Sequence, residues 1–430
     1  MSKRVLILGA GLVSRPIVDY LLEKSDFELT VADLDPANAE GVIDGRERAR
    51  AVALDVNDEQ GLGELIAASD IVVSLLPYTL HPLVAGHCLN AGKPMVNASY
   101  VSPELKALDQ EAREKSLIFL CEVGLDPGID HMSAMQIIHD IQARGGKVRV
   151  FRSVCGGLPE PAAADNPFGY KFSWSPAGVL MAGNNDARFI ENGTEVTIPE
   201  QGLFKSAWHM EIAGMSFEAY PNRDSTPYAA IYGLDDIKTL LRGTLRFPGW
   251  SLIIDELKAM GLTRATPVAL RAPFSPRALL EKHQGDLETI RQALPQRVDS
   301  ALEWLGLYDS EPREWSGDTL IDCLAQLMSE RMGYGPDERD MVVLHHEFEA
   351  EFDDHQEVIH STLVDYGQVG GSSAMARTVS LPVAIAVKLI LEGEIELTGV
   401  RIPVDESIYR PILRELEGLG IRFEENKVRQ

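Results

Sequence analysis

The chain has 430 residues, 45% of them hydrophobic and 24% charged, a composition typical of a folded globular protein with two or three domains. Its net charge of −25 argues against non-specific binding to nucleic acid or to anionic lipid. There is no apolar run of roughly 20 residues and no apolar signal-peptide core, so we expect no membrane partner. The four cysteines are scattered and include no C-x-x-C pair, so we expect a cytoplasmic protein with reduced thiols.

The first element is a short apolar run, Val5–Leu8, which predicts a fully buried parallel strand. It leads into a glycine-rich turn with a small residue, Ser14, at the third glycine position, and a helical pattern follows. Such a turn lets a pyrophosphate approach the backbone and places it at the helix N-terminus. The alternative is an inherited fold that no longer binds a nucleotide. The predicted cofactor contacts in this turn are Gly9, Gly11, Leu12 and Val13.

The second predicted strand, Phe27–Asp33, ends on a carboxylate. An acidic side chain at this position accepts hydrogen bonds from both ribose hydroxyls of NAD and repels the additional phosphate of NADP. Asp33 therefore predicts NAD as the cofactor, with NADP disfavoured. The alternative is that Asp33 only caps the following turn.

Further strands are expected over 51–56, 70–77, 94–100 and 117–122, and they alternate with helices throughout residues 1–125. This alternation predicts an α/β fold with a doubly wound parallel sheet. Because ligands bind at the carboxyl ends of such strands, Asp55 and Val56 are expected to edge the adenine, and Ser74 and Leu76 to lie near the nicotinamide.

After residue 122 the pattern changes. A rigid loop, 123–131, places Asp126 at the carboxyl edge of the sheet, where it faces the ligand crevice. Asp130 can cap the helix that follows. A strand over 148–155 then runs into Gly156-Gly157, which suggests backbone brought close to another group.

Residues 165–180 are rich in aromatic side chains and turn formers, and Trp174 is either a pocket wall or loop packing. Arginines in the loops that follow suggest carboxylate recognition by the guanidinium fork, with surface ion pairs as the alternative. These arginines are Arg223, Arg242 and Arg246.

Residues 250–335 have helical periodicity, and 341–363 alternate as an antiparallel hairpin. His345 and His346 fall on opposite faces of that hairpin, so a metal site is not expected. Residues 370–378 start a long apolar helix, which is expected to return to the first domain. The expected domains are a nucleotide-binding domain (1–125), an inserted α/β substrate and dimerisation domain (126–249 and 336–377), a helical subdomain (250–335) and a returning segment (378–430).

The chain contains, in order, GAGLVSRP, NASYVSP, EVGLDPGIDH, CGGLPEP, NPFGYKFSWSPAGVL, AYPNRDSTPY, RGTLRFPG and MARTVSLPVAIAVKLILEG. From residue 4 to about residue 420 the chain resembles the L-glutamate-forming saccharopine dehydrogenases, also called saccharopine reductases. The wider family includes carboxynorspermidine dehydrogenase, but NPxGYKFSWSP and YPNRDS resemble the saccharopine branch. The fungal members use NADP and carry a basic residue after the second strand, where this chain has Asp33.

The resemblance implies a variant Rossmann domain, an α/β domain that binds substrate and pairs subunits into a homodimer, and a small helical domain. It also implies a reversible reaction, in which L-saccharopine is oxidised at its secondary amine and the imine is hydrolysed to L-glutamate and 2-aminoadipate 6-semialdehyde. The implied substrate contacts are Ser99, Tyr100, Asp126, Trp174, Arg223 and Thr244, with Cys155 lining the pocket.

That chemistry needs a base for the amine and for the water that attacks the imine, and Asp126 is the best-placed carboxylate. Tyr100 could position or relay a proton, and Cys155 is equally an acid–base group or a small pocket residue. The three carboxylates of saccharopine would occupy Arg223, Arg246 and backbone N–H groups at Ser99-Tyr100. Two alternatives stay open, a carboxynorspermidine-type dehydrogenase and a non-catalytic NAD-binding sensor.

Overall fold

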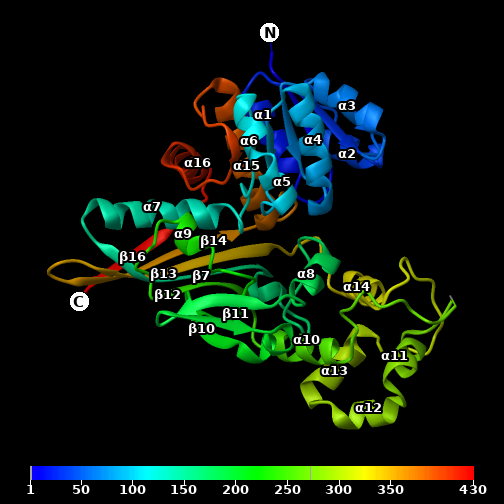
Figure 1. Ribbon diagram of the computed structural model, residues 1–430. Coiled ribbons are helices and arrows are strands. Elements are labelled where there is room, and N and C mark those ends of the chain that lie inside the picture. The colour runs from blue at the N-terminus through cyan, green and yellow to red at the C-terminus, as the bar shows by residue number, and fades with distance from the viewer. Residues whose placement is uncertain (1, 272) are drawn as a thin grey trace. The chain divides into compact units, whose positions relative to one another are not determined.

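The computed structural model describes residues 2–271 and 273–430 and divides the chain into two compact units (Figure 1). Unit 1 comprises Met1–Arg144 and Gly371–Arg422, and unit 2 comprises Gly145–Gly370 and Phe423–Gln430. The units differ from the expected domains at three boundaries: residues 126–144 belong to unit 1, residues 371–377 also belong to unit 1, and the last eight residues belong to unit 2.

Unit 1 is built on a parallel sheet whose strand order is that of a doubly wound fold, as expected from the alternation of strands and helices. In spatial order its strands are β15 (Gly399–Arg401), β6 (Ile118–Leu120), β5 (Met95–Asn97), β4 (Ile71–Ser74), β1 (Arg4–Leu8), β2 (Glu28–Asp33) and β3 (Ala49–Ala53). Its helices are α1 (Arg15–Lys24), α2 (Pro36–Ile43), α3 (Glu59–Ala67), α4 (His81–Ala91), α5 (Pro103–Ala107), α6 (Asp109–Glu114), α7 (Ile129–Ala143), α15 (Ala374–Glu392) and α16 (Glu406–Gly418), with a 3₁₀ turn η1 (Tyr78–Leu80).

Apart from the exposed Arg4 and the small polar Ser74, the central strands β1 and β4 are apolar, and Val5–Leu8 and Ile71–Ser74 are buried, which is the pattern of parallel strands covered by helices. Helix α15 packs on α1, α16, β4 and β5. With 19 residues and a mean hydropathy of 1.7 it is long and apolar enough for a membrane span, contrary to the expectation that no segment is. However, 67% of its most apolar 18-residue stretch is buried inside the protein, as in the core helix of a folded domain.

Unit 2 contains a mixed sheet in which long neighbouring strands form the centre. In spatial order the strands are β10 (Trp208–Ile212), β11 (Met215–Pro221), β12 (Thr239–Arg246), β7 (Lys147–Pro159), β13 (Asp340–Glu351), β14 (Gln356–Tyr366) and β16 (Glu424–Arg429), with β8 (Ala187–Glu191) and β9 (Thr194–Ile198) off this path. Strands β13 and β14 are the expected antiparallel hairpin. The C-terminal strand β16 pairs with β14, which is why the end of the chain belongs to unit 2.

The helical residues 250–331 share one hydrophobic core with the sheet of unit 2 instead of forming a core of their own. Figure 1 shows helices α10 to α14 grouped beside the sheet. The helices of unit 2 are α8 (Pro176–Ala182), α9 (Tyr228–Ile231), α10 (Trp250–Ala259), α11 (Pro276–Gln284), α12 (Leu287–Ala293), α13 (Gln296–Leu305) and α14 (Leu320–Arg331), with 3₁₀ turns η2 (Pro161–Ala163), η3 (Glu200–Gly202) and η4 (Phe204–Ser206).

The turn between β6 and α7 closes tightly on itself in unit 1. Gly124 N donates to Pro127 O (2.9 Å), and Ile129 N donates to Gly124 O (2.8 Å). Gly128 has φ 148°, and a Cβ atom there would lie 2.1 Å from Gly124 O. Glycine is therefore required at position 128 by both backbone conformation and space.

We predict that Gly128→Ala lowers the free energy of unfolding by about 2–4 kcal/mol, because the methyl group forces the turn open and the backbone is strained. The matched control is Gly145→Ala: Gly145 also has positive φ (82°), but no atom lies within 4 Å of its Cβ position. That control should lose only about 1–2 kcal/mol. Urea unfolding measures both, and equal losses would contradict the steric argument.

Candidate active site

The glycine-rich turn after β1 has the geometry expected of a phosphate-binding turn. Gly9 has φ 99°, and its N–H donates to Ala32 O on the neighbouring strand (2.8 Å). Ser14 is fully buried and its hydroxyl donates to Gly9 O (3.0 Å), which ties the start of α1 to the end of β1. The small residue at the third position of the motif therefore holds the turn through a hydrogen bond and also lets the helix and the strand pack closely.

Gly11 needs a different explanation, since its φ is not positive and no atom lies within 4 Å of its Cβ position. Nothing in the described chain requires glycine there, and the open space above it suits close approach by a ligand. Leu12 is 72% exposed and Val13 is half-buried. These residues fit the phosphate bridge of a dinucleotide at the N-terminus of α1.

Asp33 ends β2, as expected, but its carboxylate is already bound to the surrounding chain. One oxygen accepts from Ala10 N (2.8 Å), and the other accepts from Asp35 N (3.0 Å) and Asn38 Nδ2 (3.3 Å). Partial burial opposes ionisation, but these hydrogen bonds hold the pKa of Asp33 below its ordinary value. The side chain thus caps the turn that follows β2, which was the alternative left open by the sequence.

The other expected cofactor contacts lie after β3 and β4. Asp55 is exposed, and its carboxylate accepts from the backbone and side-chain amides of Asn57 (2.9 and 2.8 Å). Val56 and Leu76 are half-buried. Ser74 is buried, and its hydroxyl lies 2.9 Å from His81 Nδ1.

The segment after β5 brings two of the expected substrate contacts, Ser99 and Tyr100, to the carboxyl edge of the sheet. Ser99 N donates to Asn97 Oδ1 (2.9 Å), so this N–H group, expected to bind a substrate carboxylate, is used within the loop. The Ser99 hydroxyl lies 2.9 Å from His81 Nε2. The Tyr100 hydroxyl donates to Asp126 Oδ1 (3.1 Å). The structure therefore pairs two of the three predicted catalytic residues.

A buried acid–histidine pair lies beside these loops and was not singled out from the sequence. Glu122, 5% exposed, accepts from Val101 N at Oε1 (3.0 Å), and its Oε2 lies 2.8 Å from His131 Nε2. His81 was missed as well. Glu122 and His81 could have been found from their positions in the chain. Glu122 follows strand β6 and His81 follows strand β4, at the edge of the sheet where ligands bind.

In unit 2, Cys155, Thr244 and Arg246 lie on one face of the sheet. Thr244 of β12 is the register partner of Cys155 of β7, and Arg246 is two residues further along β12. Arg242 and Arg246 were expected in loops, but both are buried within strand β12. The strand extends through them because β12 is paired on both sides by β7 and β11.

Arg246 is a buried cation with little protein compensation. It is 5% exposed, its Nη1 donates to Leu245 O (2.7 Å), and its guanidinium lies over the rings of Tyr170 (4.9 Å) and Trp250 (5.4 Å). Its Nε has no hydrogen-bond partner, and no ion pair is formed with a carboxylate in residues 2–271 and 273–430. Glu218, opposite it on β11, instead caps α10 through Gly249 N and Ser251 N.

The remaining predicted contacts of unit 2 are less buried. Trp174 is partly buried against the core of unit 2, and a Cβ atom at Gly178 of α8 would lie 2.9 Å from its ring. Arg223 is exposed, with φ 54°, and its carbonyl accepts from Arg188 N (2.9 Å). The Trp174 ring therefore contributes to loop packing, which was one of the two roles expected for it from the sequence.

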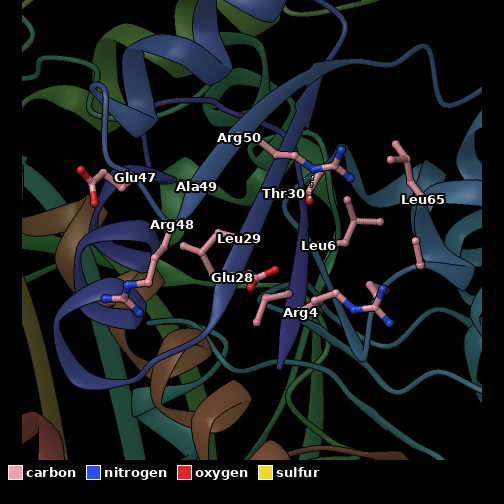
Figure 2. A pocket seen from close by; sticks show the side chains of 13 residues that line it. Arg4, Leu6, Glu28, Leu29, Thr30, Glu47, Arg48, Ala49, Arg50 and Leu65 are labelled. Atoms are coloured by element: carbon pink, nitrogen blue, oxygen red, sulfur yellow. Dashed lines mark hydrogen bonds between the residues drawn. The ribbon is translucent and has the colours of Figure 1, made fainter. Parts of the chain in front are cut away.

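Unit 1 and unit 2 each have a cavity, and neither cavity is lined by the glycine-rich turn, Tyr100 or Asp126. One of about 310 Å³ opens at the amino-terminal ends of β1, β2 and β3 (Figure 2). Its arginines are engaged by the protein: Arg50 Nε donates to Thr30 Oγ1 (3.0 Å), and Arg48 Nη1 donates to Ser25 O (2.7 Å). A second, of about 360 Å³, is lined by Arg152, Val154, Trp208, Met210, His345 and Glu347.

The histidines of the hairpin lie as alternation predicts. His345 contacts Thr362 Oγ1 through Nδ1 (2.8 Å) and stacks on His360, whereas His346 stacks on Phe423. Outside residues 1 and 272, no group of three or more His, Cys, Asp or Glu side chains is arranged to hold a metal ion.

Comparisons with known proteins agree with this architecture. The family models described as "Saccharopine dehydrogenase NADP binding domain" and "Saccharopine dehydrogenase C-terminal domain" match residues 5–120 and 124–421. The chain is 38% identical to the "Saccharopine dehydrogenase [NADP(+), L-glutamate-forming]" of Saccharomyces cerevisiae, with 100% of each chain covered, and 37% identical to that of Schizosaccharomyces pombe, with 98% of each covered. The solved apo structure of the S. cerevisiae enzyme superposes with a TM-score of 0.90 over 99% of this chain.

The same domain occurs within a longer protein. The chain is 38% identical to the mitochondrial "Alpha-aminoadipic semialdehyde synthase" of Bos taurus, where the match covers 98% of this chain and 47% of the bovine protein.

These findings contradict the expectation of NAD. The matching nucleotide-binding domain is an NADP-binding one, and the fungal relatives are named as NADP(+) enzymes. The physical reason for the error is that Asp33 caps its own turn, so an acidic residue after β2 is not by itself evidence of ribose recognition. From the fold, the motifs in order and the similarity over its whole length, this chain belongs to the saccharopine dehydrogenase family.

Proposed function

We propose that this chain catalyses the reversible, NADP-dependent oxidation of L-saccharopine to L-glutamate and 2-aminoadipate 6-semialdehyde. The observation that supports it best is the hydrogen-bonded Tyr100–Asp126 pair at the carboxyl ends of β5 and β6. This pair occurs in a chain that is similar over its whole length to enzymes named for that reaction.

The chemistry determines what the side chains must do. The secondary amine must be neutral before a hydride leaves its carbon, and NADP supplies the hydride acceptor. Water then adds to the imine carbon, and the carbon–nitrogen bond breaks to release the amine of glutamate and the aldehyde. Asp126 is the proposed base, first for the amine proton and then for the attacking water. Tyr100, which donates to Asp126 Oδ1, orients that carboxylate and can pass a proton to it.

Substrate recognition rests on carboxylates. Saccharopine has three, and a buried guanidinium without a protein carboxylate favours an anionic ligand, since a buried charge is otherwise costly. We therefore propose that Arg246 binds a substrate carboxylate, with Arg223 and Thr244 as further contacts and Cys155 as a pocket residue. A polyamine substrate has a single carboxylate and would need fewer arginines, so it is not favoured. The homodimer and the cytoplasmic location stay predictions.

The first prediction is the activity itself. Purified protein with saccharopine at alkaline pH should reduce NADP, detected at 340 nm, and should reduce NAD much less efficiently. Glutamate and an aldehyde should appear in equal amounts. Carboxynorspermidine in place of saccharopine should give no turnover. Cofactor binding without saccharopine-dependent reduction would contradict an enzymatic function and favour a nucleotide-binding sensor.

The second prediction concerns the base. Asp126→Ala should lower kcat by about 10²–10⁴-fold, the usual contribution of a positioned proton-transfer group, while NADPH binding measured by fluorescence stays unchanged. Asp44→Asn, at an exposed carboxylate that ends α2, is the control and should retain full activity. Loss of NADPH binding in Asp126→Ala would argue against the assignment.

The third prediction separates substrate binding from stability at Arg246. Arg246→Met keeps most of the side-chain volume and removes a buried charge that has no ion-pair partner, so thermal stability should stay the same or rise. The KM for saccharopine should rise on the order of 100-fold through loss of a charge-assisted contact. Arg291→Met, at a surface arginine paired with Asp299 and Glu303, is the control and should leave KM unchanged. An unchanged KM in Arg246→Met would show that this arginine does not bind substrate.

A further inference from the structure

His81 is the first residue of α4 and is buried between the ends of two strands of unit 1. Its Nδ1 lies 2.9 Å from the hydroxyl of Ser74, the last residue of β4. Its Nε2 lies 2.9 Å from the hydroxyl of Ser99, two residues beyond β5. One ring therefore links the carboxyl ends of two neighbouring strands.

Both ring nitrogens of His81 are used by this link. Burial lowers the pKa of His81 to about 4, so the ring is neutral near pH 7, with one nitrogen as donor and the other as acceptor. The two serine hydroxyls complement it in either tautomer. A ring with both nitrogens engaged by the protein is suited to holding a loop in place.

A second buried histidine acts on the other side of the same loop. His131 lies 2.8 Å from Glu122 Oε2, and the other oxygen of Glu122 accepts from Val101 N (3.0 Å). Glu122 N also donates to Ser99 O (3.1 Å). His131 is fully buried and Glu122 nearly so, so this contact is protected from water.

Tyr100 lies between the two held residues, Ser99 and Val101. We propose that His81, through Ser99, and His131, through Glu122, are positioning residues that fix Tyr100 in the orientation in which its hydroxyl meets Asp126. This inference rests on the proposed function, because it assigns the purpose of the two networks to the Tyr100–Asp126 pair. Misplacement of a reacting group by about 1 Å costs up to roughly 10²-fold in rate.

The test uses pairs of substitutions that differ in which ring nitrogen they imitate. An asparagine amide falls near the Nδ1 position and a glutamine amide near the Nε2 position. His81→Asn keeps the contact to Ser74 and loses the one to Ser99, whereas His81→Gln keeps the contact to Ser99. We expect kcat to fall by about 10–100-fold in His81→Asn and to recover largely in His81→Gln.

The same pair applies to His131, whose Nε2 contacts Glu122, so His131→Asn should lose activity and His131→Gln should retain most of it. KM for NADP should stay unchanged in both His131 variants and in His81→Asn, which keeps the contact to the expected cofactor residue Ser74. The matched control is His87→Asn, at a half-buried residue further along α4 that lies near Gly63 of α3. It should retain the wild-type kcat.

A double-mutant cycle distinguishes positioning of Tyr100 from a general structural role. If His81 acts through Tyr100, His81→Asn should lower kcat in the wild-type background and have little further effect in Tyr100→Phe. Additive losses in the two backgrounds would overturn the proposal. So would equal kcat in His81→Asn, His81→Gln and wild type, each corrected for its folded fraction.

Hydrogen–deuterium exchange gives a readout that does not depend on activity. Amides of residues 97–101 should exchange faster in His81→Asn than in His87→Asn or wild type, with the rest of unit 1 unchanged. Unchanged exchange there would overturn the proposal even if the protein proves inactive with saccharopine. An inactive wild type with the expected exchange would overturn the proposed function alone.

Discussion

The arrangement of the candidate site in unit 1 depends on one buried carboxylate, Glu122. Its two oxygens face different partners, the backbone of Val101 and the ring of His131, and its own N–H donates to Ser99 O. A carboxylate in this position is stable only when its oxygens are satisfied, so the chain around it has few alternative conformations. The loops after β5 and β6 are thereby joined, and Tyr100 and Asp126 are presented from a fixed backbone.

Unit 2 shows the opposite use of a buried charge. Arg246 lies against the rings of Tyr170 and Trp250, and no carboxylate of the described chain pairs with it. Stacking on aromatic faces recovers part of the cost of burial, but less than an ion pair would. Each oxygen of Glu122 has a protein partner, whereas Arg246 has no carboxylate partner in the described chain. This difference is the basis for proposing a structural role for Glu122 and a ligand-binding role for Arg246.

Much of unit 1 could be predicted because its signals are local. The run Val5–Leu8, the bend at Gly9 and the small buried residue at position 14 act within a single strand–turn–helix, and the structure agrees with each. His81 could not be found this way, since its partners are 7 and 18 residues distant and meet it only when β4 and β5 pair. Arg242 and Arg246 were expected in loops because pairing on both sides of β12, which makes them strand residues, is a tertiary property.

Asp33 shows why cofactor choice is harder to predict than the fold. A carboxylate at the end of β2 can accept from ribose hydroxyls or from the backbone of its own turn, and both uses favour an acidic residue at the same position. The sequence pattern is identical in the two cases. In this chain three protein donors, at Ala10, Asp35 and Asn38, already meet the two oxygens. The turn is therefore enough to explain an acidic residue at position 33, so its presence alone does not distinguish NAD from NADP.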